Sequence, residues 1–115
     1  MAAAVPPRDR RLQAGWQFRE VYRKGKPYHG DLMTLITLGR PEDHGRVAYV
    51  ASRRVGAAVK RNRAKRLLRE AFRALPAQRR EMAVWRIWIA KAACAAATLA
   101  QVSEEMGRLV AREPR

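Results

Sequence analysis

The sequence predicts a single α+β domain with its elements in the order helix, two or three strands, helix, strand and helix, α-β-β-β-α-β-α. Three observations predict it. The chain has 115 residues and a mass of 13.1 kDa, which allows one compact domain. Because 48% of its residues are apolar, it can build a core that a disordered chain lacks. Its apolar positions switch between helical spacing and strand alternation along the chain.

The first helix is expected at about residues 14–24. Phe18, Val21 and Tyr22 are spaced so that they share one helix face, and Gly25 follows at the position of a C-cap. Before this helix, residues 1–10 are rich in Pro and Arg and predict a flexible basic arm. The folded domain is therefore expected at residues 11–113.

Two strand regions are expected next. Residues 27–38 are rich in Thr, Leu and Ile and predict a strand with a short leading strand, while residues 39–45 have turn composition. The β-branched and aromatic run at residues 47–51 predicts a further strand. The intervening turn predicts that these two strands are antiparallel neighbours.

The second half of the chain predicts helix, strand and helix. A helical stripe spans residues 57–75 and ends before Pro76, and residues 84–90 alternate as a buried strand does. Residues 92–97 are expected to form a turn into a last helix, which Thr98 and Gln101 open as a capping box. The expected apolar stripes are Ala64, Leu68, Ala71, Phe72 and Leu75 in the longer helix, and Leu99, Val102, Met106, Leu109 and Val110 in the last one.

Positive charge is concentrated in one segment. The chain carries a net charge of +15, and residues 52–73 hold nine cations against one acidic residue, Glu70. On the predicted helix, most of them occupy the face opposite the apolar stripe, where ordinary solvated faces mix both signs. Planar guanidinium groups bind phosphates bidentately and stack on bases. The segment therefore predicts a nucleic-acid interface, whose affinity for about six phosphates falls with salt at a logarithmic slope of roughly 4 to 5.

The same segment resembles a known family. The run from Ser52 to Arg73, with its Arg-Asn-Arg core at Arg61 to Arg63, is similar to the signature of the bacterial ribonuclease P protein component. Phe18, Val21, Tyr22 and Gly25 resemble that family's first-helix pattern, and residues 85–91 and 98–99 resemble its last strand and helix more loosely. The resemblance covers about residues 11–112. It implies an α/β sandwich with a left-handed β-α-β crossover, against the usual hand of such connections.

The resemblance also implies a function and partners. The chain would be the accessory protein subunit of an RNA-based endonuclease that removes 5′ leaders from precursor tRNA. Catalysis and Mg²⁺ would belong to the RNA subunit, and the protein would bind that RNA and the substrate. The residues implied to contact the RNA subunit are Arg61, Asn62, Arg63, Lys65, Arg66, Arg69 and Arg73.

A second group is implied to bind the single-stranded leader: Phe18, Tyr22, Ile36, Arg53 and Arg54. From the spacing alone, an aromatic pair one helical turn apart is more often simple core. Ile36 stands where relatives often place a stacking Tyr, which predicts a weaker leader contact. Arg86 stands where their last strand begins with Asp, and Lys91 where it closes with Arg, so we expect no salt bridge there.

No catalytic or metal site is predicted in the protein itself. The ten carboxylates are scattered, Cys94 has no His placed beside it by sequence, and one Cys with two His cannot make a four-ligand zinc site. We expect a cytoplasmic protein with no membrane span and no evident protein partner. Trp16, Trp85 and Trp88 are expected to pack, although Trp16 could instead edge the RNA surface.

Three alternatives remain at this stage. A different small basic RNA-binding module, such as a ribosomal protein, would share the charge and size. A helix-turn-helix DNA binder would need a short helix just before Ala57, where the sequence indicates a strand and a glycine loop. A self-sufficient nuclease would cleave RNA without an RNA subunit.

Overall fold

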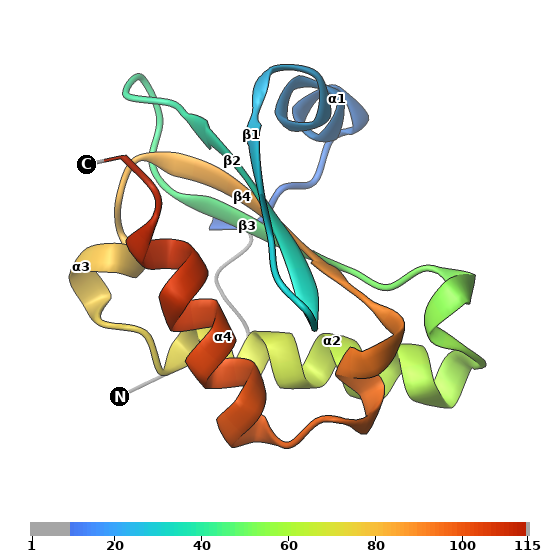
Figure 1. The fold of residues 1–115 in the computed structure, drawn as a ribbon. Helices are drawn as coiled ribbons and strands as arrows, with labels where there is room; N and C mark the ends of the chain where they lie inside the picture. Colours follow the sequence, from blue (N-terminus) through green and yellow to red (C-terminus); the bar gives the residue numbers. More distant parts are fainter. Residues whose placement is uncertain (1–9, 115) are drawn as a thin grey trace.

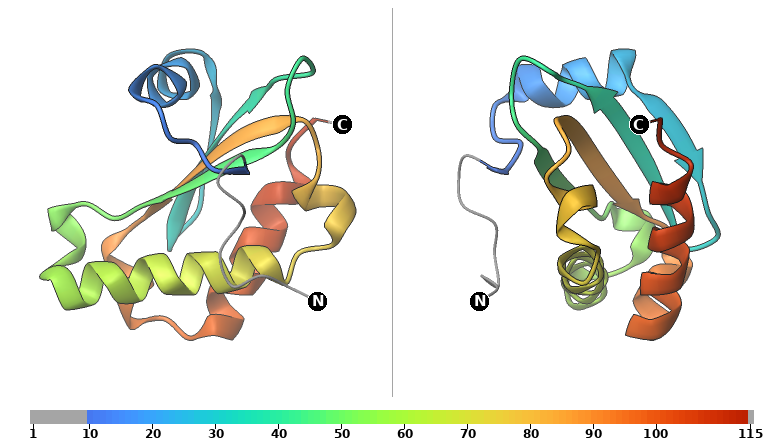
Figure 2. Two further views of the ribbon diagram at one scale, coloured as in Figure 1. Left: turned by 180° about the vertical axis from the view of Figure 1, so that it is seen from behind. Right: turned by 90° about the vertical axis from the view of Figure 1, so that its left-hand side faces the viewer.

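The computed structural model describes residues 10–114, which form a four-stranded sheet with helices on both faces (Figure 1). Helices α2 and α4 cover one face, and α1 lies against the other (Figure 2). The predicted arm at residues 1–10 lies outside the described part except for Arg10. The elements are α1 (Gly15–Lys24), β1 (Lys26–His29), β2 (Met33–Gly39), β3 (Arg46–Val50), η2 (Arg53–Val55), α2 (Ala58–Arg73), α3 (Ala77–Arg80), β4 (Val84–Ala90), η3 (Ala92–Ala96) and α4 (Leu99–Ala111).

The sheet has the order β1-β2-β4-β3, so the prediction that β2 and β3 are antiparallel neighbours is wrong. Strand β4 lies between them, antiparallel to β2 and parallel to β3. Its residues 85–88 are all buried, because side chains on both faces of this strand meet a core. A strand that is apolar on both sides takes the centre of a sheet. The parallel pairing of β3 with β4 requires a crossover, and α2 supplies it.

The larger core lies between the sheet and helices α2 and α4. The predicted apolar stripe of α2 is confirmed, with Leu75 only half-buried at its end, and the stripe of α4 is confirmed except for Leu99, which is exposed. The capping box of Thr98 and Gln101 is present. Residues 92–96 form the 3-10 turn η3, in agreement with the predicted turn. The short helix α3 is an addition to the predicted elements, because Pro76 ends one helix and also stands at the N-cap of the next.

A smaller core lies on the opposite face under α1. Val21 is buried against this face of the sheet, and the chain leaves α1 through Gly25. An added Cβ at Gly25 would lie 2.5 Å from the Val21 carbonyl oxygen and 2.7 Å from Ile36. Only glycine therefore lets the end of α1 approach β2 this closely. This close approach fixes the position of the aromatic residues on α1 relative to the sheet.

A buried ion pair joins the C-terminal segment to the sheet, which corrects the expectation of no salt bridge at Arg86. The Arg86 guanidinium donates to both carboxylate oxygens of Glu113, each at 2.8 Å, and both side chains are almost fully buried. Thr37 donates a third hydrogen bond to Glu113 at 2.6 Å. The sequence does not reveal this pair, because Glu113 lies 27 residues after Arg86, outside β4, and no helical or strand periodicity connects the two positions. The Lys91 ammonium group donates to the Gly30 carbonyl.

Candidate nucleic-acid interface

Helix α2 and the turn before it present the concentrated positive charge. Strand β3 ends at Val50, and the 3-10 turn η2 places Arg53 and Arg54 ahead of the helix. Gly56 then adopts a φ of 136°, a conformation that L side chains rarely adopt. An added Cβ there would lie 2.8 Å from the Lys60 side chain. Gly56 thus lets the chain turn sharply from the sheet into α2.

None of the nine cations between residues 53 and 73 forms an ion pair with a carboxylate of residues 10–114. Arg53, Arg54, Lys60, Arg63 and Arg66 are exposed, as is Asn62. Most of the described carboxylates are instead paired with cations elsewhere: Glu20, Glu42, Asp43, Glu104, Glu105 and Glu113. The carboxylates of residues 10–114 therefore leave the charge of this surface without ion-pair partners, and such a surface attracts a polyanion.

Two of the predicted RNA-binding arginines also hold the backbone. Arg63 donates from Nε to the Ala95 carbonyl at 2.7 Å and from Nη2 to the Ala97 carbonyl at 3.4 Å. Arg61 is half-buried, and its Nη1 donates to the Gly56 carbonyl at 2.9 Å. These bonds tie α2 to η3 and to the glycine turn. They fix both guanidinium groups in place before any ligand binds, which lowers the entropic cost of binding.

Three other cations of α2 are less exposed than Lys60, Arg63 and Arg66. Lys65, Arg69 and Arg73 are half-buried rather than fully exposed. The Arg69 guanidinium lies 5.6 Å from the centre of the Tyr49 ring on β3. Burial raises the pKa of Tyr49 despite the nearby arginines, so its hydroxyl stays neutral. The exposed cationic surface consequently runs from η2 along α2 as far as Arg66, and beyond it Arg69 packs on the edge strand β3.

The predicted leader-binding residues lie mainly on the opposite face of the sheet. Phe18 on α1 and Ile36 on β2 are both half-buried and pack against the smaller core, as do Val50 and Ile89. Tyr22, one helical turn after Phe18, is 49% exposed. Partial burial raises its pKa, so the phenol remains neutral at physiological pH. The structure thus brings Phe18 and Ile36 into one cluster, with Tyr22 exposed on the same helix and the two arginines beyond the end of β3.

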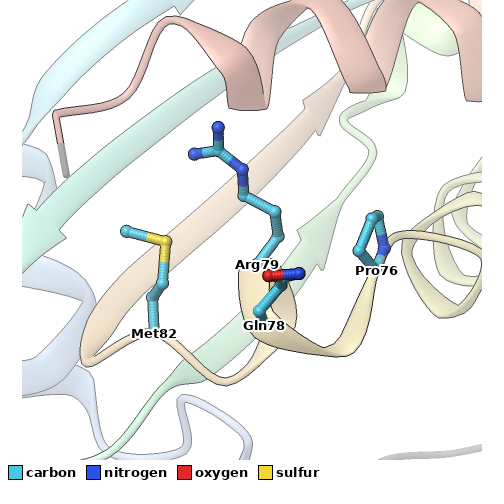
Figure 3. Close-up of a pocket in the computed structure, with 4 residues that line it drawn as sticks. All are labelled: Pro76, Gln78, Arg79 and Met82. Atoms are coloured by element: carbon cyan, nitrogen blue, oxygen red, sulfur yellow. The ribbon is translucent and has the colours of Figure 1, made fainter.

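Within residues 10–114 there is no nucleophile and base pair. Cys94 is fully buried, and its burial raises its pKa to about 11, which disfavours the reactive thiolate. His29 makes a hydrogen bond with Thr34 instead, at 3.3 Å between Nδ1 and Oγ1. A pocket of about 440 Å³ at α3 is lined by Pro76, Gln78, Arg79 and Met82, with Arg79 extending toward α4 (Figure 3). No acidic or nucleophilic side chain lines that pocket.

Sequence reasoning missed the contacts that position these surfaces. The buried Glu105 carboxylate accepts the backbone N–H groups of Asp31, Leu32 and Met33 at 2.8 to 3.0 Å. It thereby holds the β1–β2 connection against α4. Glu105 falls among the buried positions of α4, and a charged residue at an apolar position is the one signal that could have identified it.

Comparison with known proteins decides the family. The family model for ribonuclease P matches residues 7–113. The chain belongs to the ribonuclease P protein family. A ribonuclease P protein component of Clostridioides difficile is 30% identical over 105 residues, which cover 91% of this chain and 92% of that protein. The component of Desulfotalea psychrophila is 39% identical over 67 residues, so that match spans only about half of that relative, 56% of its length.

Solved structures of this family share the fold. A ribonuclease P protein from Staphylococcus aureus matches with a TM-score of 0.76 and 26% identity, covering 89% of this chain and 93% of that one. The protein from Thermotoga maritima matches with a TM-score of 0.78 and 22% identity, covering 91% and 98%. The predicted α+β domain is therefore confirmed. Within residues 10–114, the helices lack the length and apolar character needed to cross a membrane.

Proposed function

We propose that this chain is the protein subunit of a ribonucleoprotein endonuclease that removes the 5′ leader from precursor tRNA. Its partners would be the catalytic RNA subunit and the precursor tRNA, and its compartment the cytoplasm. The observation that supports this most is the cationic surface of η2 and α2, which has no ion pair with the carboxylates of the described part of the chain, in a member of this family. The protein would bind and position RNA and would break no bond itself.

The catalytic RNA is assigned to the surface of α2. Asn62, Arg63 and Arg66 are exposed along one side of the helix, and Arg61 and Arg63 are already held by backbone carbonyls. Fixed guanidinium groups suit the phosphates of a folded RNA, whose positions are themselves fixed. Lys65, Arg69 and Arg73 would contact the same RNA from the half-buried side of the helix.

The leader is assigned to the α1 side of the sheet. Single-stranded RNA binds proteins by stacking its bases on aromatic rings, and each base can contribute about 1 to 3 kcal/mol. Phe18 and Tyr22 offer such rings on α1, Ile36 packs against the same core as Phe18, and Arg53 and Arg54 would contact phosphates. Because Ile36 can pack against a base but cannot stack as an aromatic ring does, we expect a modest leader affinity.

Mg²⁺ does not fit this chain as a resident ion. Among the described residues, no three His, Cys, Asp or Glu side chains are grouped as metal ligands. Mg²⁺ prefers carboxylate and phosphate oxygens, and most carboxylates here already pair with cations. We therefore assign Mg²⁺ to the RNA subunit.

Rescue of cleavage at low Mg²⁺ tests the proposal. The purified protein, added to a bacterial ribonuclease P RNA, should restore cleavage of precursor tRNA at a Mg²⁺ concentration where the RNA alone is nearly inactive. A ribosomal RNA-binding module of equal charge serves as the control. Failure to rescue would favour the alternative of a different RNA-binding module, and cleavage by protein treated with ribonuclease would favour a self-sufficient nuclease.

Phe18→Ala tests the leader assignment. In the reconstituted holoenzyme, this variant should lower affinity for leader-bearing substrate by about fivefold or more, the loss expected for one stacked base, with little effect on mature tRNA. The comparison of the two dissociation constants is the measurement. Equal losses on both RNAs would assign Phe18 to the core, where it already packs against half-buried neighbours.

A further inference from the structure

Trp16 is an exposed aromatic side chain outside the residues assigned so far. It lies in the first turn of α1, and 49% of it is exposed, whereas Trp85 and Trp88 are almost completely buried. Exposure of so much indole surface is unfavourable unless something covers it. The question is what the exposed ring would contact.

The Trp16 ring rests on a fixed base. Its centre lies 5.6 Å from that of Trp85 at an interplanar angle of 59°, and the Arg40 guanidinium lies 4.1 Å from the centre of the Trp85 ring. Trp85 donates its indole N–H to Asp43 at 3.0 Å, and Arg40 forms ion pairs with Glu20 and Glu42. These contacts hold Trp85 in place, so the inner side of Trp16 meets a rigid surface.

The start of α1 is also held in place. The side-chain oxygen of Gln17 accepts the backbone N–H groups of Gln13 and Ala14, at 2.7 and 3.0 Å. These two hydrogen bonds replace the side-chain cap that Ala14 cannot provide. The backbone that carries Trp16 is thus fixed before a ligand binds, so binding costs little conformational entropy at this position.

Positive charge lies beside the exposed ring. Arg19 is exposed, and its guanidinium reaches back to Gly15, where an added Cβ would lie 3.2 Å from Nη1. Helix α1 holds three cations against one carboxylate, that of Glu20. An aromatic ring with a cation next to it suits a nucleobase and its phosphate better than an apolar protein surface.

We propose that Trp16 is a stacking platform for a nucleobase of single-stranded RNA, and that it extends the leader-binding surface beyond Phe18 and Tyr22. The inference rests on the proposed function. Trp16 lies six residues before Tyr22, about 9 Å along the axis of α1 and about 120° around it, so a single strand that has passed Tyr22 reaches Trp16 only farther along, by following the surface of the helix. The nucleotide on Trp16 therefore belongs to the distal part of the leader, and Arg19 contacts its phosphate.

Three substitutions at Trp16 separate stacking from packing. Trp16→Phe retains an aromatic ring, whereas Trp16→Leu retains apolar volume over Trp85 but cannot stack. With precursor tRNA that has a long leader, Trp16→Ala and Trp16→Leu should weaken holoenzyme binding by about fivefold or more, and Trp16→Phe by less than about twofold. With a short leader that reaches Phe18 and Tyr22 but does not extend to Trp16, all three variants should bind like the wild type.

Fluorescence gives a direct readout, because Trp16 is the only exposed tryptophan. Long-leader RNA should protect the wild-type protein from acrylamide quenching, and this protection should be lost in Trp16→Phe. Three outcomes would each overturn the inference. Trp16→Leu could bind the long leader as tightly as the wild type does, or the variants could lose equal affinity for both leaders. Anionic lipid vesicles, rather than RNA, could protect Trp16 from quenching. If the wild-type holoenzyme shows no preference for leader-bearing substrate, the proposed function itself fails.

Discussion

Arg63 and Arg66 lie one turn apart on α2, yet the structure predicts different consequences for their loss. Arg66 is exposed and makes no hydrogen bond or ion pair within residues 10–114, whereas Arg63 donates to the carbonyls of Ala95 and Ala97. Each arginine can neutralise one RNA phosphate, so either alanine variant should lower the logarithmic salt slope by about 0.7 to 0.9. Arg63→Ala should in addition reduce the free energy of unfolding by about 1 kcal/mol, the usual net value of a hydrogen bond, while Arg66→Ala should leave it unchanged.

Two measurements check this pair of variants. Titration of the catalytic RNA with protein over a series of KCl concentrations gives the slope, and urea unfolding gives the stability. The matched variant Arg66→Lys keeps the charge and should keep the slope. Unchanged slopes in both alanine variants would show that this side of α2 faces away from the RNA. Equal stability of the two alanine variants would show that the bonds to η3 contribute nothing.

Two further predictions concern the carboxylates. Glu113→Gln should lower the free energy of unfolding by about 3 to 5 kcal/mol, because it leaves the Arg86 charge buried without a counter-ion. As a control, Glu104→Gln removes the exposed ion pair with Arg108 and should lower the free energy of unfolding by less than about 0.5 kcal/mol. Similar losses of stability in the two variants would refute the role of burial. The Arg46 hydrogen bond lowers the pKa of Asp43 from 3.8 to about 2, so its stabilisation is complete above pH 3.8 and is lost as the pH falls toward 2. Thermal melts should therefore show that the stability advantage of the wild type over Asp43→Asn shrinks across this range; a constant difference would contradict the shift.

Local patterns predicted the elements but not their arrangement. Helices α1, α2 and α4 and strand β4 follow from apolar spacing, because each buries one continuous stripe or run. Strand order depends on which surfaces pair across long stretches of chain. The turn composition after Leu38 predicts a hairpin of β2 and β3, yet β4, whose two faces both meet a core, lies beside β2 instead. No local signal distinguishes a hairpin from two strands that admit a third between them.

The candidate interface was predictable in part. The cations of α2 could be identified from charge density alone, and among the described residues no carboxylate forms an ion pair with them. The structural role of Arg63, which joins α2 to the segment at η3, could not be identified from the sequence. Its acceptors, Ala95 and Ala97, lie more than thirty residues away and contribute only backbone carbonyls. Backbone acceptors have no sequence signature. The support of Trp16 by Trp85 and Arg40 likewise depends on three elements that meet only in the folded chain.

The central position of β4 has a consequence for biosynthesis. A nascent chain that has emerged from the ribosome only as far as α2 contains β2 and β3, but neither has its main hydrogen-bonding neighbour. Such unpaired edges are open to association with other chains. The sheet can be completed only after residue 90 has emerged, and α4 can cover it only later still. The domain is therefore expected to fold after most of its translation is complete, and fragments truncated before β4 are expected to aggregate.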